Sequence, residues 1–491
     1  MIDYSILEHT SAEPEACSMI ESFRSIGYSI ETAIADILDN SISAGAKNIW
    51  IDYAWEGADT VLSIMDDGWG MNDGEIIQAM RPGILSPLSL RPEDDLGRFG
   101  LGLKTASFSQ CRKFCLISKK TDSQPAFWTW DLDYVNTIKS WQLLRYKPEP
   151  QFFEKKFNDL ERGSIVLWWD IDRLTNRLKA DSSTSKEHFL STMDTVKKHL
   201  AMVFHRYIED GLNIFFRDRR IEPWDPFMIG YEGLQPRPET LLENGKIKIK
   251  GFVLPHRSRL TPEGYTYGKG PKDSWTAQQG FYIYRNCRLL VAGEWLNLFK
   301  REVHYDLCRI RIDLPNSMDN EWQIDIKKSV ARPPAELREQ IIAIAKDVRE
   351  QAVEVYRHRG KVIKRKLARD EYFPFWEEKA RYGKRFYKLS REHPILKELL
   401  DNAGALKDQL ETTLQFIEET VPVPLITLQE SEGERPYGQP FEGKNHDAVY
   451  DVMKSMYSRL INEGDTPERA KARIANIEPF NFHLEYLDKL S

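Results

Sequence analysis

The sequence lacks the long apolar runs that membrane proteins need. Its 491 residues contain no stretch of about 18 apolar residues, and the first ten, MIDYSILEHT, do not place a basic region before an apolar one. Cysteine is also scarce: the five cysteines are odd in number and form no C-x-x-C pair with the spacing of metal ligands. We therefore expect a soluble protein of the reducing cytoplasm, without a secretory signal and without membrane contact.

A strong charge of one sign is missing as well. The net charge is −6, from 69 basic and 75 acidic side chains, which argues against a wholly basic nucleic-acid coat protein. The charge is nevertheless segregated, because residues 357–391 carry thirteen Lys or Arg against four Asp or Glu. Aromatic residues lie between these charges, namely Tyr372, Phe373, Phe375, Trp376, Tyr382, Phe386 and Tyr387. Such a segment suits phosphate contacts and base stacking, whereas the alternative is a helical pair with an aromatic core and solvated lysines.

The chain is too long for one compact core. At one domain per about 100 to 200 residues it should hold roughly three domains. The residue patterns predict a mixed helix-and-sheet domain over residues 1–175 and a second α/β domain over 176–335. A helical region that is basic and aromatic should follow over 336–428, and then a linker and small helical tail over 429–491. The predicted fold class is therefore α+β.

A polar stripe runs along the helix that residues 29–44 predict. Asp36 and Asn40 fall on the side opposite an apolar stripe, so this helix presents a carboxylate and a carboxamide together. The apolar stripe consists of Ile34, Ile37, Leu38 and Ile42, and Ser43 accompanies the polar one. Taken alone, a polar stripe of this kind is most often a solvated helix face.

Two glycine-rich segments follow this helix. The first, DDGWGM at residues 66–71, ends a predicted strand, where Asp66 would accept the exocyclic amine of adenine and the glycines would admit the ring. An ordinary tight turn accounts for the same residues. The second, GRFGLGLK at residues 97–104, leads into a helix and offers backbone amides and a lysine to phosphate. Each segment is weak alone, but helix and segments in this order indicate a nucleotide site.

The segments ADILDNSISAGA, MDDGWGM and LGRFGLGLKTAS resemble the nucleotide-binding boxes of the GHKL ATPase superfamily. The resemblance is closest to MutL-like and MORC-like ATPases of bacterial restriction and defence systems. It implies a Bergerat fold, a sheet covered on one face by helices, with ATP and Mg²⁺ under a flexible lid that we place at residues 85–104. In that family a first-box carboxylate activates the attacking water, and an asparagine four residues on holds Mg²⁺. These positions are Asp36, which replaces the usual glutamate, and Asn40.

Further site residues come from the same resemblance. Ser164, in ERGSIVLWWD, matches a later family box whose hydroxyl supports the adenine-binding aspartate through water, although an ordinary turn fits too. GFYIYRNCRLL and EWQIDIKKSVARPP resemble the ribosomal-S5-like transducer domain, which supplies a lysine to the γ-phosphate. We assign that catalytic role to Lys328, with Lys327 as the alternative. The other implied nucleotide contacts are Gly68, Gly70, Met71, Gly97, Arg98, Phe99, Gly100, Leu101, Gly102, Leu103 and Lys104.

Three functions compete for this sequence. The preferred one is an ATPase that forms ADP and phosphate, dimerises when ATP orders the lid, and clamps or remodels DNA beside a nuclease or other defence protein. A histidine kinase needs a phosphoacceptor histidine on a dimerisation helix, and only His9 precedes the first box, in too short an arm. The third function, a nucleotide-gated module that binds protein instead of DNA, suits the acidic character of the whole chain. The last hundred residues show no carboxylate and histidine cluster typical of a nuclease.

Overall fold

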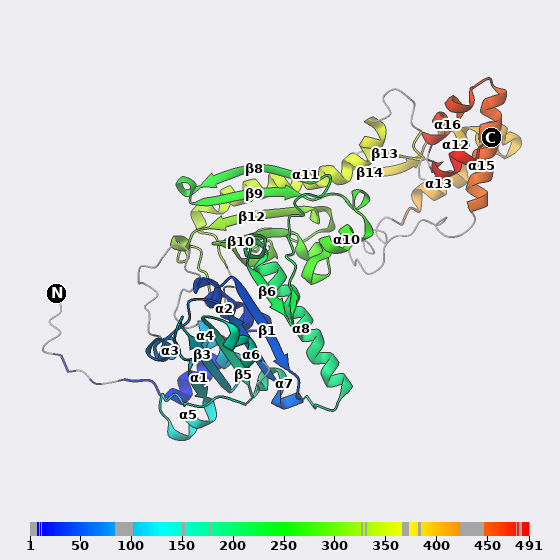
Figure 1. The fold of residues 1–491 in the computed structure, drawn as a ribbon. Coiled ribbons are helices and arrows are strands. Elements are labelled where there is room, and N and C mark those ends of the chain that lie inside the picture. The colour runs from blue at the N-terminus through cyan, green and yellow to red at the C-terminus, as the bar shows by residue number, and fades with distance from the viewer. Residues whose placement is uncertain are drawn as a thin grey trace. The chain divides into compact units, whose positions relative to one another are not determined.

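The structure is a computed structural model that describes residues 7–8, 10, 12–83, 102–149, 153–175, 178–325, 328, 331–365, 373–381, 384–422, 446–477, 479–480 and 484–490. It divides into two compact units, Met1–Arg301 with Tyr305–Glu350, and Glu302–His304 with Gln351–Ser491 (Figure 1). Within the described ranges, no helix combines the length and the apolar character that crossing a membrane requires.

A seven-stranded sheet organises the first unit, with the strand order β4-β3-β5-β2-β1-β6-β7. Its strands are β1 Asn48–Ala54, β2 Val61–Asp66, β3 Lys113–Lys119, β4 Ala126–Asp131, β5 Gly163–Trp169, β6 Asn213–Phe216 and β7 Arg219–Arg220. Neighbouring strands are antiparallel except β1 and β6, which are parallel. Strand β1 alternates between half-buried and buried residues, as the spacing of Ile49, Ile51 and Tyr53 predicts.

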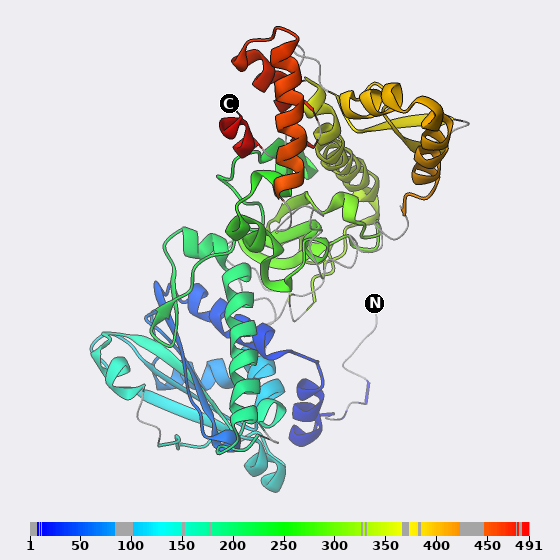
Figure 2. The ribbon, with the colours of Figure 1, turned by 90° about the vertical axis from the view of Figure 1, so that its right-hand side faces the viewer.

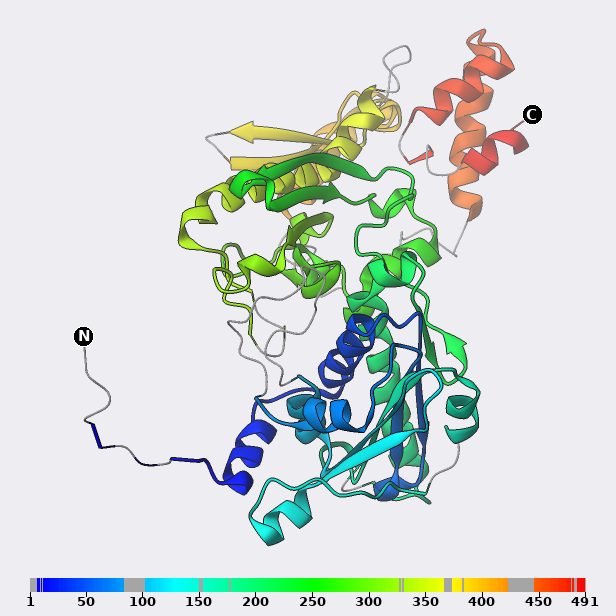
Figure 3. The ribbon, with the colours of Figure 1, turned by 60° about the vertical axis from the view of Figure 1, so that its left-hand side comes forward.

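Helices cover both faces of this sheet unequally. Helices α1 Ala16–Arg24, α2 Ile30–Ser43, α4 Gly102–Gln110 and α8 Ser183–Val203 share one large apolar core with it. A separate, smaller core contains Met65 of β2 together with Ile165 and Leu167 of β5. Helix α6 Glu154–Asp159 contributes Phe157 to this second core. Figures 2 and 3 show α8 running along the sheet, and it contacts α2. The predicted α/β sandwich is confirmed. Shorter helices complete the domain: α3 Asp73–Met80, α5 Leu132–Ile138, α7 Asp172–Thr175 and α9 His205–Glu209.

The first sheet extends past residue 175, where sequence analysis ended the first domain. Strands β6 and β7, from residues 213–220, pair onto β1. The boundary was placed in the polar segment ADSSTSKE, but that segment starts a helix: the Ser182 side chain accepts a hydrogen bond from the amide of Ser185 at the N-terminus of α8. The polar residues therefore cap a helix that packs on α2 instead of separating two domains.

A five-stranded sheet forms the second part of the first unit, with the order β11-β10-β12-β9-β8. Its strands are β8 Gln235–Leu242, β9 Ile247–Val253, β10 Gly280–Arg285, β11 Arg288–Glu294 and β12 Cys308–Leu314. Helix α10 Pro262–Lys269 lies between β9 and β10 in sequence, and α11 Ala335–Arg365 begins after the sheet. Helix α11 buries Leu337, Ile341 and Val348. Val348 packs directly on Gly251 of β9, because a Cβ atom at Gly251 would lie 2.3 Å from Val348 Cγ2. A second sheet with packed helices therefore follows the first one within this unit.

The second unit is mostly helical, but it also contains a β-hairpin. Its helices are α12 Pro394–Asn402, α13 Lys407–Glu419, α15 His446–Asn462 and α16 Pro467–Ala475. Strands β13 Trp376–Arg381 and β14 Lys384–Leu389 pair antiparallel, and Leu389 packs against α12 and α13. The helical expectation for 376–389 is wrong, because these residues pair as an antiparallel hairpin whose Leu389 packs into a small core with the two helices. The predicted linker, roughly residues 430–445, lies outside the described residues.

Candidate functional site

The charged face of α2 is buried, which separates it from an ordinary solvated helix face. Helix α2 begins after Ser29, whose amide donates to Thr32 Oγ1 at 3.1 Å, and it packs Ile34 and Leu38 into the large core. On its other side Asp36 is only 2% exposed. Burying a carboxylate is unfavourable unless partners compensate it, so the groups that surround Asp36 are informative.

Both carboxylate oxygens of Asp36 have partners. Tyr28 Oη donates to Oδ2 at 2.7 Å, and Lys328 Nζ donates to Oδ1 at 3.2 Å. Oδ2 also faces the start of α4, because a Cβ atom built on Gly102 would lie 3.8 Å from it. The base predicted from the first box and the lysine predicted from the second domain therefore meet beside a helix N-terminus, where backbone amides favour anions.

A second carboxylate on α2 joins the same cluster. Asp39 is 1% exposed, and Arg288 Nε of β11 lies 2.9 Å from each of its oxygens. Lys328 Nζ lies 2.5 Å from Asp39 Oδ2, and an Arg288 terminal nitrogen lies 3.6 Å from Asp36 Oδ1. Two carboxylates of the first sheet's helix and two cations of the second α/β domain thus form one neutral, buried cluster.

The two carboxylates differ in proton affinity. Burial raises the pKa of Asp36, and the negative charge of Asp39 adds to this, while Lys328, Arg288 and the Tyr28 hydroxyl oppose it. Burial would raise the pKa of Asp39 too, but Arg288 and Lys328 outweigh that effect and hold this pKa below its ordinary value. Asp39 therefore carries a firm negative charge, whereas Asp36 is the better proton acceptor of the pair.

Asn40 suits a role as ligand to a hard cation. Its side chain is exposed, and its Nδ2 donates to the backbone oxygen of Asp36 at 3.1 Å. The carboxamide oxygen is the remaining donor atom of this side chain, of the kind that Mg²⁺ takes. The described part of the chain holds no group of three or more His, Cys, Asp or Glu side chains that could hold a metal by themselves.

Asp66 stands at the end of β2 as a buried hydrogen-bond acceptor. Ser41 Oγ donates to its Oδ2 at 2.8 Å, and the amide of Gly68 donates to its Oδ1 at 2.9 Å. Burial raises the pKa of Asp66 to about 6, so the side chain is mostly ionised at neutral pH. Each oxygen retains a further lone pair, which suits the amine donor of an adenine ring.

The turn after Asp66 is held by close backbone packing. Gly70 has a positive φ of 68°, and a Cβ atom there would lie 1.8 Å from the backbone oxygen of Lys119, so only glycine fits. The amide of Met71 donates to Ser118 Oγ at 2.8 Å, and that oxygen lies 2.8 Å from Ser164 Oγ. Ser164 pairs with Asp66 across the sheet, so the predicted support for Asp66 lies next to it.

The phosphate end of the predicted site is described only in part. Gly102, Leu103 and Lys104 begin α4, and Lys104 is buried with its Nζ 3.0 Å from the backbone oxygen of Ala79. Burial lowers the pKa of Lys104 to about 8. Gly97, Arg98, Phe99, Gly100 and Leu101, most of the predicted lid, and Lys327 lie outside the described residues.

Sequence reasoning missed several partners of these residues. Asp39 carried a detectable signal, because a residue three positions from Asp36 lies on the same helix face. Arg288 lies within GFYIYRNCRLL but has no motif of its own, and Tyr28 precedes the first box. Ser41 and Ser118 are ordinary serines in sequence, and only the pairing of β2, β3 and β5 brings them to the adenine end.

Comparisons with known proteins agree with this geometry. A family model described as "Histidine kinase-, DNA gyrase B-, and HSP90-like ATPase" matches residues 28–164, which include Tyr28, the α2 carboxylates, Asp66 and Ser164. A similar protein is "ATPase morc-1" of Caenorhabditis elegans, 34% identical over 89 residues. That match spans 18% of this chain and 10% of the relative, so it concerns one domain of a much longer protein.

Proposed function

We propose that this chain, whose residues 28–164 match a GHKL-type ATPase family model, binds Mg²⁺ and ATP at α2 and hydrolyses ATP to ADP and phosphate, as a MORC-like ATPase would. The observation that carries the proposal is the meeting of Asp36, Tyr28 and Lys328 at the N-terminus of α4. Asp66 would hold the adenine, and Asn40 would hold Mg²⁺, which neutralises charge on the phosphates when bound.

In this mechanism the protein mainly positions a water and stabilises charge. Asp36 Oδ2 faces the start of α4, so it is the oxygen suited to accept a proton from water that attacks the terminal phosphate. Tyr28 Oη donates to the same oxygen at 2.7 Å and fixes its direction. Lys328 reaches the site from the second α/β domain and would stabilise the departing phosphate, which makes hydrolysis depend on both domains.

The direct test is phosphate release by the purified full chain, with Mg²⁺ and with EDTA in its place. We expect Mg²⁺-dependent hydrolysis in the parent. Asn40→Ala should weaken Mg²⁺-ATP binding, while the exposed Asn72→Ala, which only caps α3, serves as the control. A folded parent that neither binds nor hydrolyses ATP would contradict the proposal.

We further propose that bound ATP promotes homodimerisation, as the resemblance to MutL-like and MORC-like proteins implies. The mass in solution, measured with and without a non-hydrolysable ATP analogue, tests this step. A monomer that becomes a dimer with the analogue is the expected result, and an unchanged mass would contradict it. Hydrogen exchange over residues 85–104 tests the predicted lid, whose amides should be better protected with the analogue than without it.

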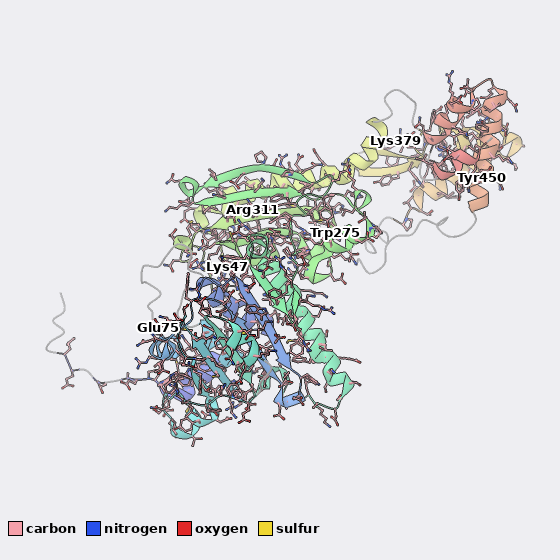
Figure 4. The ribbon with its side chains drawn as sticks, in the orientation of Figure 1. Lys47, Glu75, Trp275, Arg311, Lys379 and Tyr450 are labelled. Atoms are coloured by element: carbon pink, nitrogen blue, oxygen red, sulfur yellow. The ribbon has the colours of Figure 1, made fainter. Side chains whose placement is uncertain are left out.

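DNA is the proposed partner of the second unit. Lys379 on β13 (Figure 4) has a half-exposed side chain, and Phe386 and Tyr387 on β14 are 43% and 46% exposed. Basic residues with exposed aromatics suit a nucleic-acid backbone and its bases. From the sequence resemblance, we also propose that the protein acts in bacterial restriction or antiviral defence, together with a nuclease or another protein.

A nucleotide-gated protein-interaction module is the second candidate. Phe416 of α13 is 66% exposed and Leu406, just before that helix, is 64% exposed, and large exposed apolar side chains often mark protein contacts. A measurement of DNA affinity at low salt separates the two candidates, because a protein-interaction module does not need to bind DNA.

A further inference from the structure

Asp39 is a buried carboxylate to which the proposed reaction has so far given no task. It lies three residues after Asp36 on α2, is 1% exposed and contacts both cations of the second α/β domain. A buried ion pair is weak evidence of a stabilising role, because hydrophobic residues of similar volume often stabilise a fold as well or better. The position of this pair, one helical turn from the proposed base, calls for a functional explanation.

Lys328 is shared unequally between the two carboxylates. Its Nζ lies 2.5 Å from Asp39 Oδ2 and 3.2 Å from Asp36 Oδ1. The backbone of Lys328 takes a left-handed φ of 52°, and its amide donates to the backbone oxygen of Asp325 at 3.0 Å. Of the two carboxylates, Asp39 is therefore the nearer anchor of the Lys328 side chain.

Arg288 completes the arrangement from a rigid strand. Its Nε contacts both oxygens of Asp39 at 2.9 Å, and one terminal nitrogen donates to the backbone oxygen of Leu289 at 3.1 Å. Without Arg288, Asp39 and Asp36 would be two like charges that share one lysine in a buried site. With it, Asp39 stays ionised and oriented while Lys328 can leave for a phosphate.

We propose that Asp39 is a positioning residue for ATP hydrolysis: held by Arg288, it keeps Lys328 beside the phosphate site. This inference rests on the proposed ATPase function. Asp39 touches neither nucleotide nor water and acts through Lys328.

The test is Asp39→Asn in the full chain, with kcat and KM for ATP hydrolysis measured near neutral pH. We expect kcat about tenfold or more below the parent, with KM for ATP within about threefold, because a positioning residue affects the transition state more than binding.

Two further variants separate this role from a structural one. Asp172→Asn breaks a comparable ion pair away from the site, in which Arg24 Nη2 lies 2.5 Å from Asp172, and should lower stability while the folded protein keeps the parent's kcat. Asp39→Asn with Arg288→Gln removes both charges, so it leaves no uncompensated buried cation and serves as the test if the single variant does not fold. It should stay about tenfold or more slower than the parent, since Lys328 has still lost its anchor.

The outcomes are distinct. A folded Asp39→Asn variant with the parent's kcat, or a double variant that regains the parent's rate, overturns the proposal for Asp39. A parent that neither binds nor hydrolyses ATP overturns the proposed function instead.

Discussion

The charged cluster on α2 and the basic hairpin of the second unit show how differently the same residue types are placed in one chain. Asp36, Asp39, Arg288 and Lys328 are each at most 8% exposed and are bound to one another. On the hairpin, the Lys379 side chain is 51% exposed and pairs with Glu377 at 2.6 Å. Buried charges are costly and depend on fixed partners, whereas exposed pairs contribute about 0 to 1 kcal/mol and are screened by salt.

This difference indicates where function can be read from geometry. The α2 cluster has specific partners on elements far apart in sequence, so each substitution there should have a large and specific effect. The hairpin has charge and exposed aromatic rings but few fixed contacts, so its effects should be smaller, spread over several residues and dependent on salt.

The largest expected effect is on turnover when the base is neutralised. Asp36→Asn should bind ATP nearly as the parent does, but its rate of hydrolysis should be lower by a factor of at least about 100, the usual scale for a lost general base. Phosphate release and analogue binding measured side by side check this. Asp122→Asn is the control, because Asp122 is exposed and asparagine tolerates its positive φ of 60°. Parent-like hydrolysis by Asp36→Asn would remove the base assignment.

Loss of the adenine acceptor should come next in size. Asp66→Ala removes the acceptor that Ser41 and Gly68 orient, and leaves the adenine amine unpaired in a buried site. We expect ATP affinity to fall about 10- to 100-fold or beyond detection, because an unsatisfied buried donor costs about 1 to 3 kcal/mol. Calorimetric titration with an ATP analogue measures it, with Asp52→Ala on the neighbouring strand β1 as control. Unchanged affinity would contradict a Bergerat-type adenine site.

The pH dependence of binding sharpens the same assignment. The pKa of Asp66 is raised to about 6, so the carboxylate is charged above that pH and becomes protonated below it. If only the ionised form binds adenine, affinity should be constant above about pH 7 and fall up to about tenfold per unit below pH 6. Asp66→Asn should bind more weakly and show a flat profile in that window. A parent profile as flat as that of the variant would contradict the acceptor role.

The smallest effect is expected in the basic segment. Changing Lys364, Arg365 and Lys366 together to Glu should weaken DNA binding equally across sequences. It should also flatten the salt dependence of binding, because a protein that neutralises fewer phosphates releases fewer counterions from the DNA. Basal ATP hydrolysis should stay intact. Affinities at several salt concentrations, with an ATP analogue present, check both points. If the parent does not bind DNA at low salt, or if the variant binds it equally well, this segment is a solvated or protein-binding surface and the DNA proposal is contradicted.

The sequence predicted the parts of the fold that depend on local pattern. The alternating residues of β1, the apolar stripe of α2 and the glycine turn at Gly70 all form as expected. The hairpin at 376–389 was missed because a basic, aromatic segment gives little periodicity, and strand pairing with a packed Leu389 decides it. The first domain boundary failed because a helix cap and a linker have similar polar composition.

The site was predictable where a motif supplied it and not where tertiary contact did. Asp36, Asn40 and Asp66 came from residue patterns, and Lys328 came from the family resemblance. Arg288 could not be found this way, because its function comes from the packing of β11 on α2, between residues 249 positions apart. Asp39 lay within reach of helical spacing, yet only its burial and its cations distinguish it from a surface aspartate.

In the proposed mechanism, hydrolysis needs a lysine from the second sheet region. The direct test is the rate of ATP hydrolysis by Lys328→Ala at saturating ATP, with thermal unfolding of the same sample to correct for the folded fraction. Lys269→Ala, a lysine of α10 that lies over Tyr265, is the control. We expect ATP binding only modestly weakened and hydrolysis reduced about tenfold or more, because a charge aimed at the transition state is lost. Hydrolysis by folded Lys328→Ala at the parent's rate would contradict it.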